Sequence, residues 1–146
     1  MPGSAYIDTS VLGAYYCPEA GSEVAEAALR RIQVPVISLL VEVEFHSLVA
    51  KKRRLKELTD RQAKRITDLF ASHIAEGYYR RVLLMTDDYL KARDLLNILA
   101  TPLHTLDALH LAVALREDIP LMTSDQGLST AAKRHKCGVV WVKVPE

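Results

Sequence analysis

Four acidic side chains stand where a parallel α/β chain would bring them together, namely Asp8, Glu44, Asp107 and Asp125. Asp8 ends the apolar run 5–7, and Asp125 follows the mainly apolar run 119–124. In an open parallel sheet, the carboxyl ends of the strands form the crevice in which ligands bind. Carboxylates gathered there repel one another unless a cation is bound, and Mg²⁺ and Mn²⁺ take oxygen ligands. The pattern therefore predicts a Mg²⁺ or Mn²⁺ site.

Each of these acids also has a purely structural interpretation. Asp8 precedes a short helix predicted over 11–16, where aspartate is an ordinary N-cap, and Asp125 stands at a similar strand-to-helix turn. Asp107 lies in the first turn of a predicted helix, where a carboxylate gains a few tenths to about 1 kcal/mol from the helix dipole. Capping accounts for each residue alone, but it does not require all of them to share one edge of the sheet. The joint pattern favours a common site.

Glu44 is the most informative of the acids. On a helical wheel it falls among apolar residues, whereas Glu42 lies at the edge of that half and reaches water; the apolar residues are Leu40, Val41, Phe45, Leu48 and Val49. Burying an unpaired carboxylate costs several kcal/mol, so Glu44 must be paired, protonated or bound to metal. A buried salt bridge to an arginine is the alternative to a metal.

Hydroxyl side chains flank the acids at Thr9, Ser10, Thr123 and Ser124. They could orient carboxylates or hold metal-bound water, although turn and cap chemistry explains most of them. His110 follows Asp107 by one helical turn, but a structural histidine is the favoured interpretation. Two divalent ions about 4 Å apart can activate water and stabilise the leaving oxygen at a phosphodiester. The sequence favours this metal-assisted hydrolysis over acid–base catalysis by histidine.

Strand-like and helix-like segments alternate along the chain, which is typical of a parallel α/β sheet. Strands are predicted at 5–8, 34–38, 119–124 and 139–144, with a short extended stretch at 82–85. Beyond 11–16, helices are predicted at 23–32 with Ser22 as N-cap, from 39 to about 52, from 59–60 to 75, from 86 to about Leu99, at 106–116 with Thr105 as N-cap, and at 128–136. The helix 106–116 is apolar nearly all round and is therefore expected to be buried.

The chain resembles the PIN-domain ribonucleases in four motifs. These are YIDTSVL at 6–12, SLLVEVEF at 38–45, LDALHLAVA at 106–114 and MTSDQGL at 122–128. The length and the order of the motifs resemble the VapC-type toxins of prokaryotic toxin–antitoxin pairs. The resemblance implies a single PIN-like domain over 1–146, with a central, mostly parallel sheet of four to five strands flanked by helices.

For function, the resemblance implies a Mg²⁺- or Mn²⁺-dependent ribonuclease. Asp8, Glu44, Asp107 and Asp125 would be the catalytic, metal-binding acids, and Thr123 or Ser124 a supporting hydroxyl. It further implies a homodimer and a small antitoxin whose C-terminal segment crosses the groove and blocks the metal site with an arginine or lysine.

The charge distribution is compatible with an RNA substrate without requiring one. The formal net charge of the 146 residues is only +1. Eight of the 19 Lys and Arg residues nevertheless fall within 51–65. Phosphate contacts are predicted for Lys51, Lys52, Arg53 and Arg54, and a solvated helix–helix corner is the alternative.

Other features place the protein in the cytoplasm. Cys17 and Cys137 lack metal-ligand spacing and suit a reduced compartment. No charged leader precedes an apolar stretch, and the longest such stretch, 34–43, is too short and too polar to span a membrane.

Three other functions are compatible with parts of the sequence and compete with the toxin ribonuclease. They are a non-catalytic α/β binding module, a PIN nuclease of RNA processing without an antitoxin, and a receiver-type phospho-acceptor domain. A receiver needs an acidic pair after its first strand, where this chain has Asp8, Thr9 and Ser10. A haloacid-type phosphatase needs a second aspartate at the position of Ser10. A metal-dependent nuclease is favoured over the binding module, the receiver and the phosphatase, and the toxin role is favoured over RNA processing.

Overall fold

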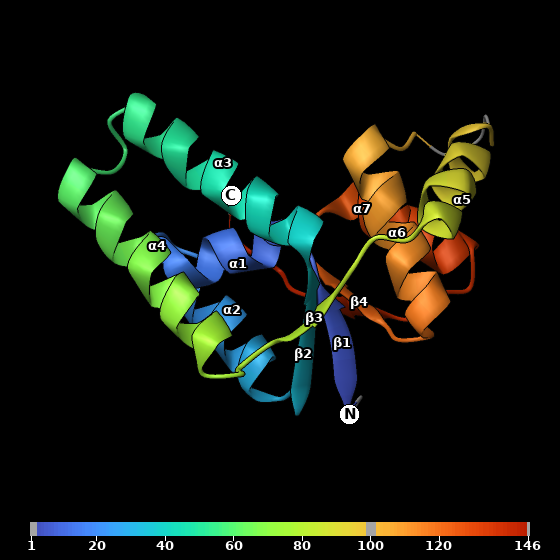
Figure 1. Ribbon diagram of the computed structural model, residues 1–146, viewed down its shortest axis with the longest axis horizontal. Coiled ribbons are helices and arrows are strands. Elements are labelled where there is room, and N and C mark those ends of the chain that lie inside the picture. The colour runs from blue at the N-terminus through green and yellow to red at the C-terminus, as the bar shows by residue number, and fades with distance from the viewer. Residues whose placement is uncertain (1–2, 99–101, 146) are drawn as a thin grey trace.

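One five-stranded sheet forms the centre of the molecule (Figure 1). The computed structural model describes residues 3–98 and 102–145. The strands are β1 (Ser4–Ile7), β2 (Val34–Ser38), β3 (Arg80–Val82), β4 (Leu121–Thr123) and β5 (Val139–Trp141). Their order is β3-β2-β1-β4-β5, and all neighbouring strands are parallel. The predicted fold class, a parallel sheet of four to five strands flanked by helices, is confirmed.

The strand order reverses between β1 and β4, which positions the ligand crevice. The chain builds the sheet outward from β1 to β3 on one side and then crosses to β4 and β5 on the other. Such a switch point leaves a crevice beyond the carboxyl ends of the two central strands. Ala5, Tyr6 and Ile7 of β1 are fully buried, as expected for a central strand covered on both faces. The residues that follow β1 and β4 therefore meet at this crevice.

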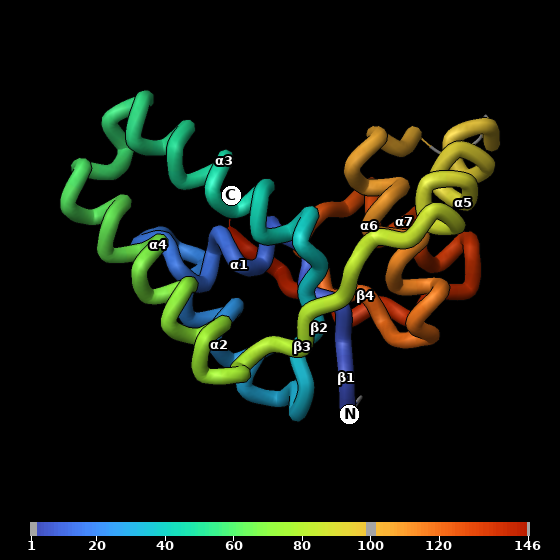
Figure 2. Tube along the Cα trace, viewed as in Figure 1, coloured from blue at the N-terminus to red at the C-terminus, as the bar shows by residue number. Residues whose placement is uncertain are grey.

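Seven helices of the described residues flank the sheet in two groups (Figures 1 and 2). One group contains α1 (Thr9–Tyr16), α2 (Ser22–Arg30), α3 (Leu39–Arg54) and α4 (Asp60–Ala75). The other contains α5 (Thr86–Leu96), α6 (Thr105–Glu117) and α7 (Gln126–Arg134). In Figure 1, α3 and α6 face each other across the upper edge of the sheet. Residues of both helices line a cavity at this edge of the sheet.

Helices α3 and α6 begin at the sheet for different local reasons. Ser38 ends β2 and caps α3, because its Oγ accepts a hydrogen bond from the backbone N–H of Val41 at 3.2 Å. The predicted burial of α6 is confirmed, since its residues from Ala108 to Ala114 are all buried. This apolar helix packs into the interior and holds Asp107 in its first turn.

Two predicted N-caps are wrong by one residue. Ser22 lies inside α2, whose N-cap is Gly21, and His104 rather than Thr105 is the N-cap of α6. The Ser22 hydroxyl instead donates to the carbonyl of Cys17 at 2.8 Å. A cap is defined by where the backbone turns into helical geometry, and the approach of the preceding loop decides that.

Several predicted boundaries also shift. The predicted extended stretch 82–85 is β3 at Arg80–Val82, and the predicted strands 119–124 and 139–144 shorten to Leu121–Thr123 and Val139–Trp141. Helix α7 starts at Gln126 and not near 128, and α3 continues to Arg54. The helix predicted to reach Leu99 ends at Leu96, and Leu99 lies outside the described residues. Strand lengths shorten because only the paired part of each apolar run forms ladder hydrogen bonds.

Within the two described ranges, no helix is both long enough and apolar enough to cross a membrane.

Candidate active site

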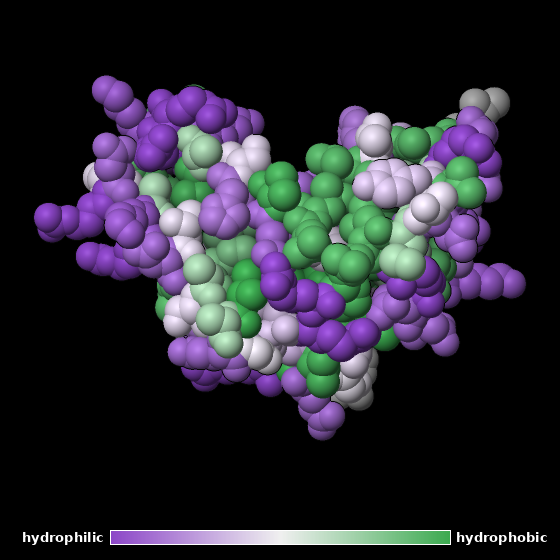
Figure 3. Space-filling view, viewed as in Figure 1, coloured by the Kyte–Doolittle hydropathy of each residue, from purple (hydrophilic) through white to green (hydrophobic). Residues whose placement is uncertain are grey.

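One cavity of about 380 Å³ at the carboxyl edge of the sheet is lined by all of the predicted acids. Asp8 follows β1, Glu44 lies on α3, Asp107 lies on α6, and Asp125 precedes α7. Figure 3 shows the surface hollowed between α3 and α6 on this side of the molecule. The structure therefore brings the four side chains to one place from four separate elements. Their catalytic and metal-binding roles stay predictions.

Asp8 occupies the N-cap position of α1, but its carboxylate is held by hydroxyl groups. Its Oδ2 accepts hydrogen bonds from Ser10 Oγ at 2.7 Å and from Thr123 Oγ1 at 2.9 Å. Its side chain makes no capping bond to the helix that follows. Asp8 is therefore an N-cap by position while its side chain serves no cap, and two of the predicted supporting hydroxyls contact this carboxylate.

Asp125 does cap its helix. Its Oδ1 accepts a hydrogen bond from the backbone N–H of Leu128 at 2.9 Å, and its own N–H donates to Thr123 Oγ1 at 3.0 Å. Thr123 thus contacts both Asp8 and Asp125 from the end of β4. Capping and cavity lining are compatible here, because the cap uses only one carboxylate oxygen.

Glu44 is paired with a histidine and a threonine, not with an arginine. Its Oε1 accepts a hydrogen bond from Thr9 Oγ1 at 3.0 Å and also contacts His110 Nε2. His110 is buried and bonded at both ring nitrogens, as expected of a structural histidine. No pattern in the sequence pairs His110 with Glu44, because the two residues lie 66 positions apart.

The predicted contrast in burial between Glu44 and Glu42 is wrong. The side chain of Glu44 is 20% exposed and that of Glu42 is 18% exposed. The two side chains differ in what they contact. Glu42 forms a bidentate ion pair with Arg81 at 2.8 and 2.9 Å, whereas Glu44 lines the cavity. The choice of Glu44 as the site residue thus rests on what each side chain faces.

Asp107 accepts no hydrogen bond within the described part of the chain. Burial, joined by the neighbouring carboxylates of Asp125 and Asp8, raises the pKa of Asp107 to about 6, and His110 and His104 oppose this rise. Desolvation and like charge both disfavour the ionised form. A bound cation would reverse that balance, because it stabilises every carboxylate around the cavity.

The last of the predicted hydroxyls contributes through its backbone. The N–H of Ser124 donates to Ser10 Oγ at 3.2 Å, and Ser10 in turn donates to Asp8. Thr9, Ser10 and Thr123 therefore contact acids directly through their hydroxyls. Groups that orient metal ligands in this way raise metal affinity.

The carboxylates share a pattern that suits a hydrated divalent ion. Asp8 Oδ2, Glu44 Oε1 and Asp125 Oδ1 are occupied by protein donors, whereas the second oxygen of each accepts no hydrogen bond from the described residues. Among residues 3–98 and 102–145, no group of three or more His, Cys, Asp or Glu side chains is arranged to hold a metal ion by itself. Mg²⁺ keeps several waters and is commonly held by one or two carboxylates. The donor set fits such an ion, with water completing its shell.

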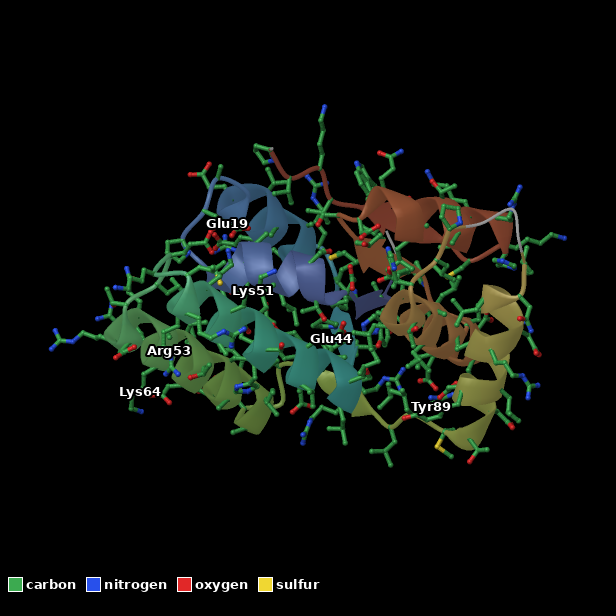
Figure 4. The ribbon with its side chains drawn as sticks, turned by 90° about the horizontal axis from the view of Figure 1, so that it is seen from above. Glu19, Glu44, Lys51, Arg53, Lys64 and Tyr89 are labelled. Atoms are coloured by element: carbon green, nitrogen blue, oxygen red, sulfur yellow. The ribbon has the colours of Figure 1, made fainter. Side chains whose placement is uncertain are left out.

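Lys51 is the basic residue that lines the cavity. Lys52 and Arg53, which were also predicted to contact phosphate, pair with Glu19 at 3.3 Å and Asp60 at 3.8 Å. Figure 4 shows Glu44 toward the centre of the molecule, Lys51 farther along α3, and Arg53 near the tip that α3 forms with α4. Arg54 is exposed at the end of α3. Lys51 is therefore the member of the basic cluster placed to meet a ligand of the acids.

The family model described as the PIN domain matches residues 5–134. The chain belongs to the PIN-domain family. The match covers all four acids, and it confirms the resemblance that the sequence motifs indicated. No curated protein matches the chain significantly.

Solved PIN-like structures share the fold at low sequence identity. FitAcB from Neisseria gonorrhoeae superimposes with a TM-score of 0.72 at 18% identity, over 92% of this chain and 95% of that one. VapC20 from Mycobacterium tuberculosis, a toxin that cleaves the sarcin–ricin loop, gives 0.69 at 21% identity, over 87% and 94%. VapBC2 from Rickettsia felis, solved with a DNA fragment from its promoter, gives 0.66 at 16% identity, over 94% and 97%. The PIN fold of this chain is thus shared over nearly its whole length.

Proposed function

We propose that this PIN-domain protein is a Mg²⁺- or Mn²⁺-dependent endoribonuclease that hydrolyses RNA phosphodiesters. The observation that carries the proposal is the cavity lined by Asp8, Glu44, Asp107 and Asp125, with Lys51 beside them. Three of these carboxylates have one oxygen occupied by the protein and one left for a ligand. Membership of the PIN family supports nuclease chemistry.

The roles of the residues follow from their contacts. Bound divalent ions would polarise the scissile phosphate and activate water for in-line attack. Ser10 and Thr123 orient Asp8 through Oδ2, and Thr9 and His110 orient Glu44 through Oε1, so that Asp8 Oδ1 and Glu44 Oε2 would be the oxygens that bind metal. The protein thus holds its oxygen ligands in place before substrate arrives, which lowers the cost of organising the site.

RNA is the proposed substrate because a neighbour of the same fold, VapC20, cleaves an RNA loop. We propose that Lys51 contacts a phosphate next to the cleaved bond and that Arg54 contacts the backbone farther along. Lys52 and Arg53 would first have to leave Glu19 and Asp60, so their contribution to binding is smaller. Such contacts add salt-dependent affinity without selecting bases.

The proposed biological role is that of a toxin held inactive by a small antitoxin in the cytoplasm. Structural neighbours come from toxin–antitoxin complexes, including one from Klebsiella pneumoniae with a TM-score of 0.66 at 19% identity, over 97% of this chain and 99% of that one. An arginine or lysine of the antitoxin would pair with the carboxylates of the cavity and displace the metal. A neighbouring open reading frame whose product copurifies with this chain and suppresses cleavage would support this role.

A homodimer is also proposed, and exposed apolar side chains support it. Leu39 and Val43 on α3 are 40% and 68% exposed, and Leu83 and Met85 before α5 are 61% and 51% exposed. Figure 3 shows apolar surface in the middle of this face. Large apolar patches on soluble proteins are commonly interaction sites. Sedimentation equilibrium of the wild-type protein and of Val43→Glu tests the proposal, with dissociation of a dimer as the supporting result.

The decisive experiment is cleavage of a mixed structured RNA by the wild-type protein, Asp8→Asn and Glu42→Gln. Wild-type cleavage that needs Mg²⁺ or Mn²⁺, stops in EDTA and is lost in Asp8→Asn would support the proposal. Glu42→Gln is the control, because Glu42 lies near the site but is paired with Arg81. If calorimetry detects no metal binding to the wild-type protein and no RNA is cut, the non-catalytic binding module is the better interpretation.

A further inference from the structure

A buried chain of hydrogen bonds lies behind Glu44. The hydroxyl of Tyr6 on β1 lies 2.7 Å from Ser38 Oγ and 2.7 Å from His110 Nδ1. His110 Nε2 on α6 contacts Glu44 Oε1. Ser38 and Tyr6 are fully buried, and His110 is 1% exposed. The chain therefore joins the end of β2, the central strand and α6 to a carboxylate of the cavity.

The direction of these hydrogen bonds follows from counting protons. Ser38 Oγ already accepts the N–H of Val41 at 3.2 Å, and its single proton can be donated to the Tyr6 oxygen. Tyr6 then donates to His110 Nδ1, which leaves the ring proton on Nε2, facing Glu44. With a neutral imidazole, only this direction gives every proton an acceptor.

The reverse direction leaves buried groups unsatisfied. If Tyr6 donated to Ser38, the Ser38 proton would have no acceptor among the described residues. His110 Nδ1 would then have to carry the ring proton, and the lone pair of a neutral ring at Nε2 would face the Glu44 carboxylate. A buried polar group without a hydrogen-bond partner destabilises the folded protein. The first direction is therefore the stable one.

We propose that His110 is a positioning residue for Glu44, set in its Nε2–H tautomer by Tyr6 and Ser38. Together with Thr9, His110 occupies Oε1 of Glu44, which leaves Oε2 as the oxygen without a donor among the described residues and thus the one to bind metal. This series of hydrogen bonds starts at Ser38, the N-cap of α3, and returns to Glu44 in the second turn of the same helix. It thereby holds Glu44 in position relative to Asp8 and Asp107 across the crevice. The inference rests on the proposed metal-dependent function of this site.

The first test needs no variant. Long-range ¹H–¹⁵N correlation of the metal-free wild-type protein at neutral pH reports the protonation of each ring nitrogen of His110. The expected result is a proton on Nε2 and none on Nδ1. A proton on Nδ1, alone or together with one on Nε2, would overturn the assigned direction.

The second test measures Mn²⁺ affinity by calorimetry in His110→Leu, His110→Gln and Tyr6→Phe. Removing the donor in His110→Leu should weaken Mn²⁺ binding about 10- to 100-fold, as loss of a group that orients a metal ligand commonly does. His110→Gln retains an N–H that can reach Glu44 and should restore most of the affinity. Tyr6→Phe should weaken Mn²⁺ binding less than His110→Leu. Without the Tyr6 hydroxyl, His110 should populate both neutral tautomers, so that each of its ring nitrogens is partly protonated.

Tyr79→Phe is the matched control. It also removes a buried phenol hydroxyl from a short hydrogen bond, to Tyr16 at 2.6 Å, but away from the cavity. It should change neither Mn²⁺ affinity nor the His110 tautomer. Equal Mn²⁺ affinity in the wild-type protein and a folded His110→Leu would overturn the positioning role alone. A wild-type protein that binds no Mn²⁺ and cuts no RNA would overturn the proposed function as well.

Discussion

Asp107→Asn should stabilise the metal-free protein at neutral pH. The pKa of Asp107 is raised from 3.8 to about 6 in the folded protein, by burial and by the charges of Asp125 and Asp8. At about 1.4 kcal/mol per tenfold change in the ionisation constant, this difference corresponds to about 3 kcal/mol. The side chain is only partly buried, so solvent screening reduces the expected gain to about 1–2 kcal/mol.

The sign of the pH dependence follows from linkage. Between pH 3.8 and about 6, the folded protein binds the Asp107 proton more tightly than the unfolded chain does. The stability of the wild-type protein should therefore fall as the pH rises through this window, and the loss should be complete above about pH 6. Asparagine cannot ionise, so the variant should lack this part of the pH dependence.

Urea unfolding in EDTA at several pH values between 4 and 7.5 measures both effects. Asp68→Asn is the control, because Asp68 is exposed and pairs with Lys64 one turn away on α4. In saturating Mn²⁺ the wild-type protein should become more stable than Asp107→Asn, because it gains stability from metal binding that the variant partly loses. An Asp107→Asn variant no more stable than wild type in EDTA at pH 7.5 would refute the argument that the acids repel one another.

Three further predictions concern the same cavity. Glu44→Gln should lower the rate of RNA cleavage by more than the roughly 10- to 100-fold that is typical of losing a group that orients a metal ligand. Glu42 is about equally exposed, but Glu42→Gln should lower the rate less than about threefold. Equal losses of cleavage in the two variants would contradict the assignment of Glu44. Thr123→Val removes the contacts to Asp8 and Asp125 together and should weaken Mn²⁺ binding about 10- to 100-fold by calorimetry, with wild-type affinity as the contrary result. Lys51→Ala, made in the Asp8→Asn background, should reduce the slope of RNA affinity against salt concentration by about one ion, measured by fluorescence anisotropy in EDTA. Lys133→Ala, at an exposed position on α7, should leave this slope unchanged. An unchanged slope for Lys51→Ala would show that Lys51 makes no phosphate contact.

The convergence of the four acids at one cavity could be predicted largely from the sequence, because strand ends in a parallel sheet meet at one edge. The apolar runs before Asp8 and Asp125 indicate strand ends, and the apolar helix after Asp107 indicates burial. Glu44 was chosen from a helical wheel and again from the resemblance to the PIN family, and the family match confirms that resemblance. Exposure along α3 could not be read from a helical wheel, because it depends on which elements pack against each face.

The sequence by itself determined the alternation of strands and helices, the parallel sheet, the buried α6 and the position of the acids at element ends. These features follow from hydrophobic periodicity and turn chemistry, which act over a few residues. The tertiary structure alone decided the partners: Thr123 reaches Asp8 across 115 positions, and Tyr6 reaches His110 across 104. It also decided that Glu42 pairs with Arg81 and that Lys51 lines the cavity. Such pairings depend on the order of strands in the sheet, which places distant residues side by side and leaves no periodic trace in the sequence.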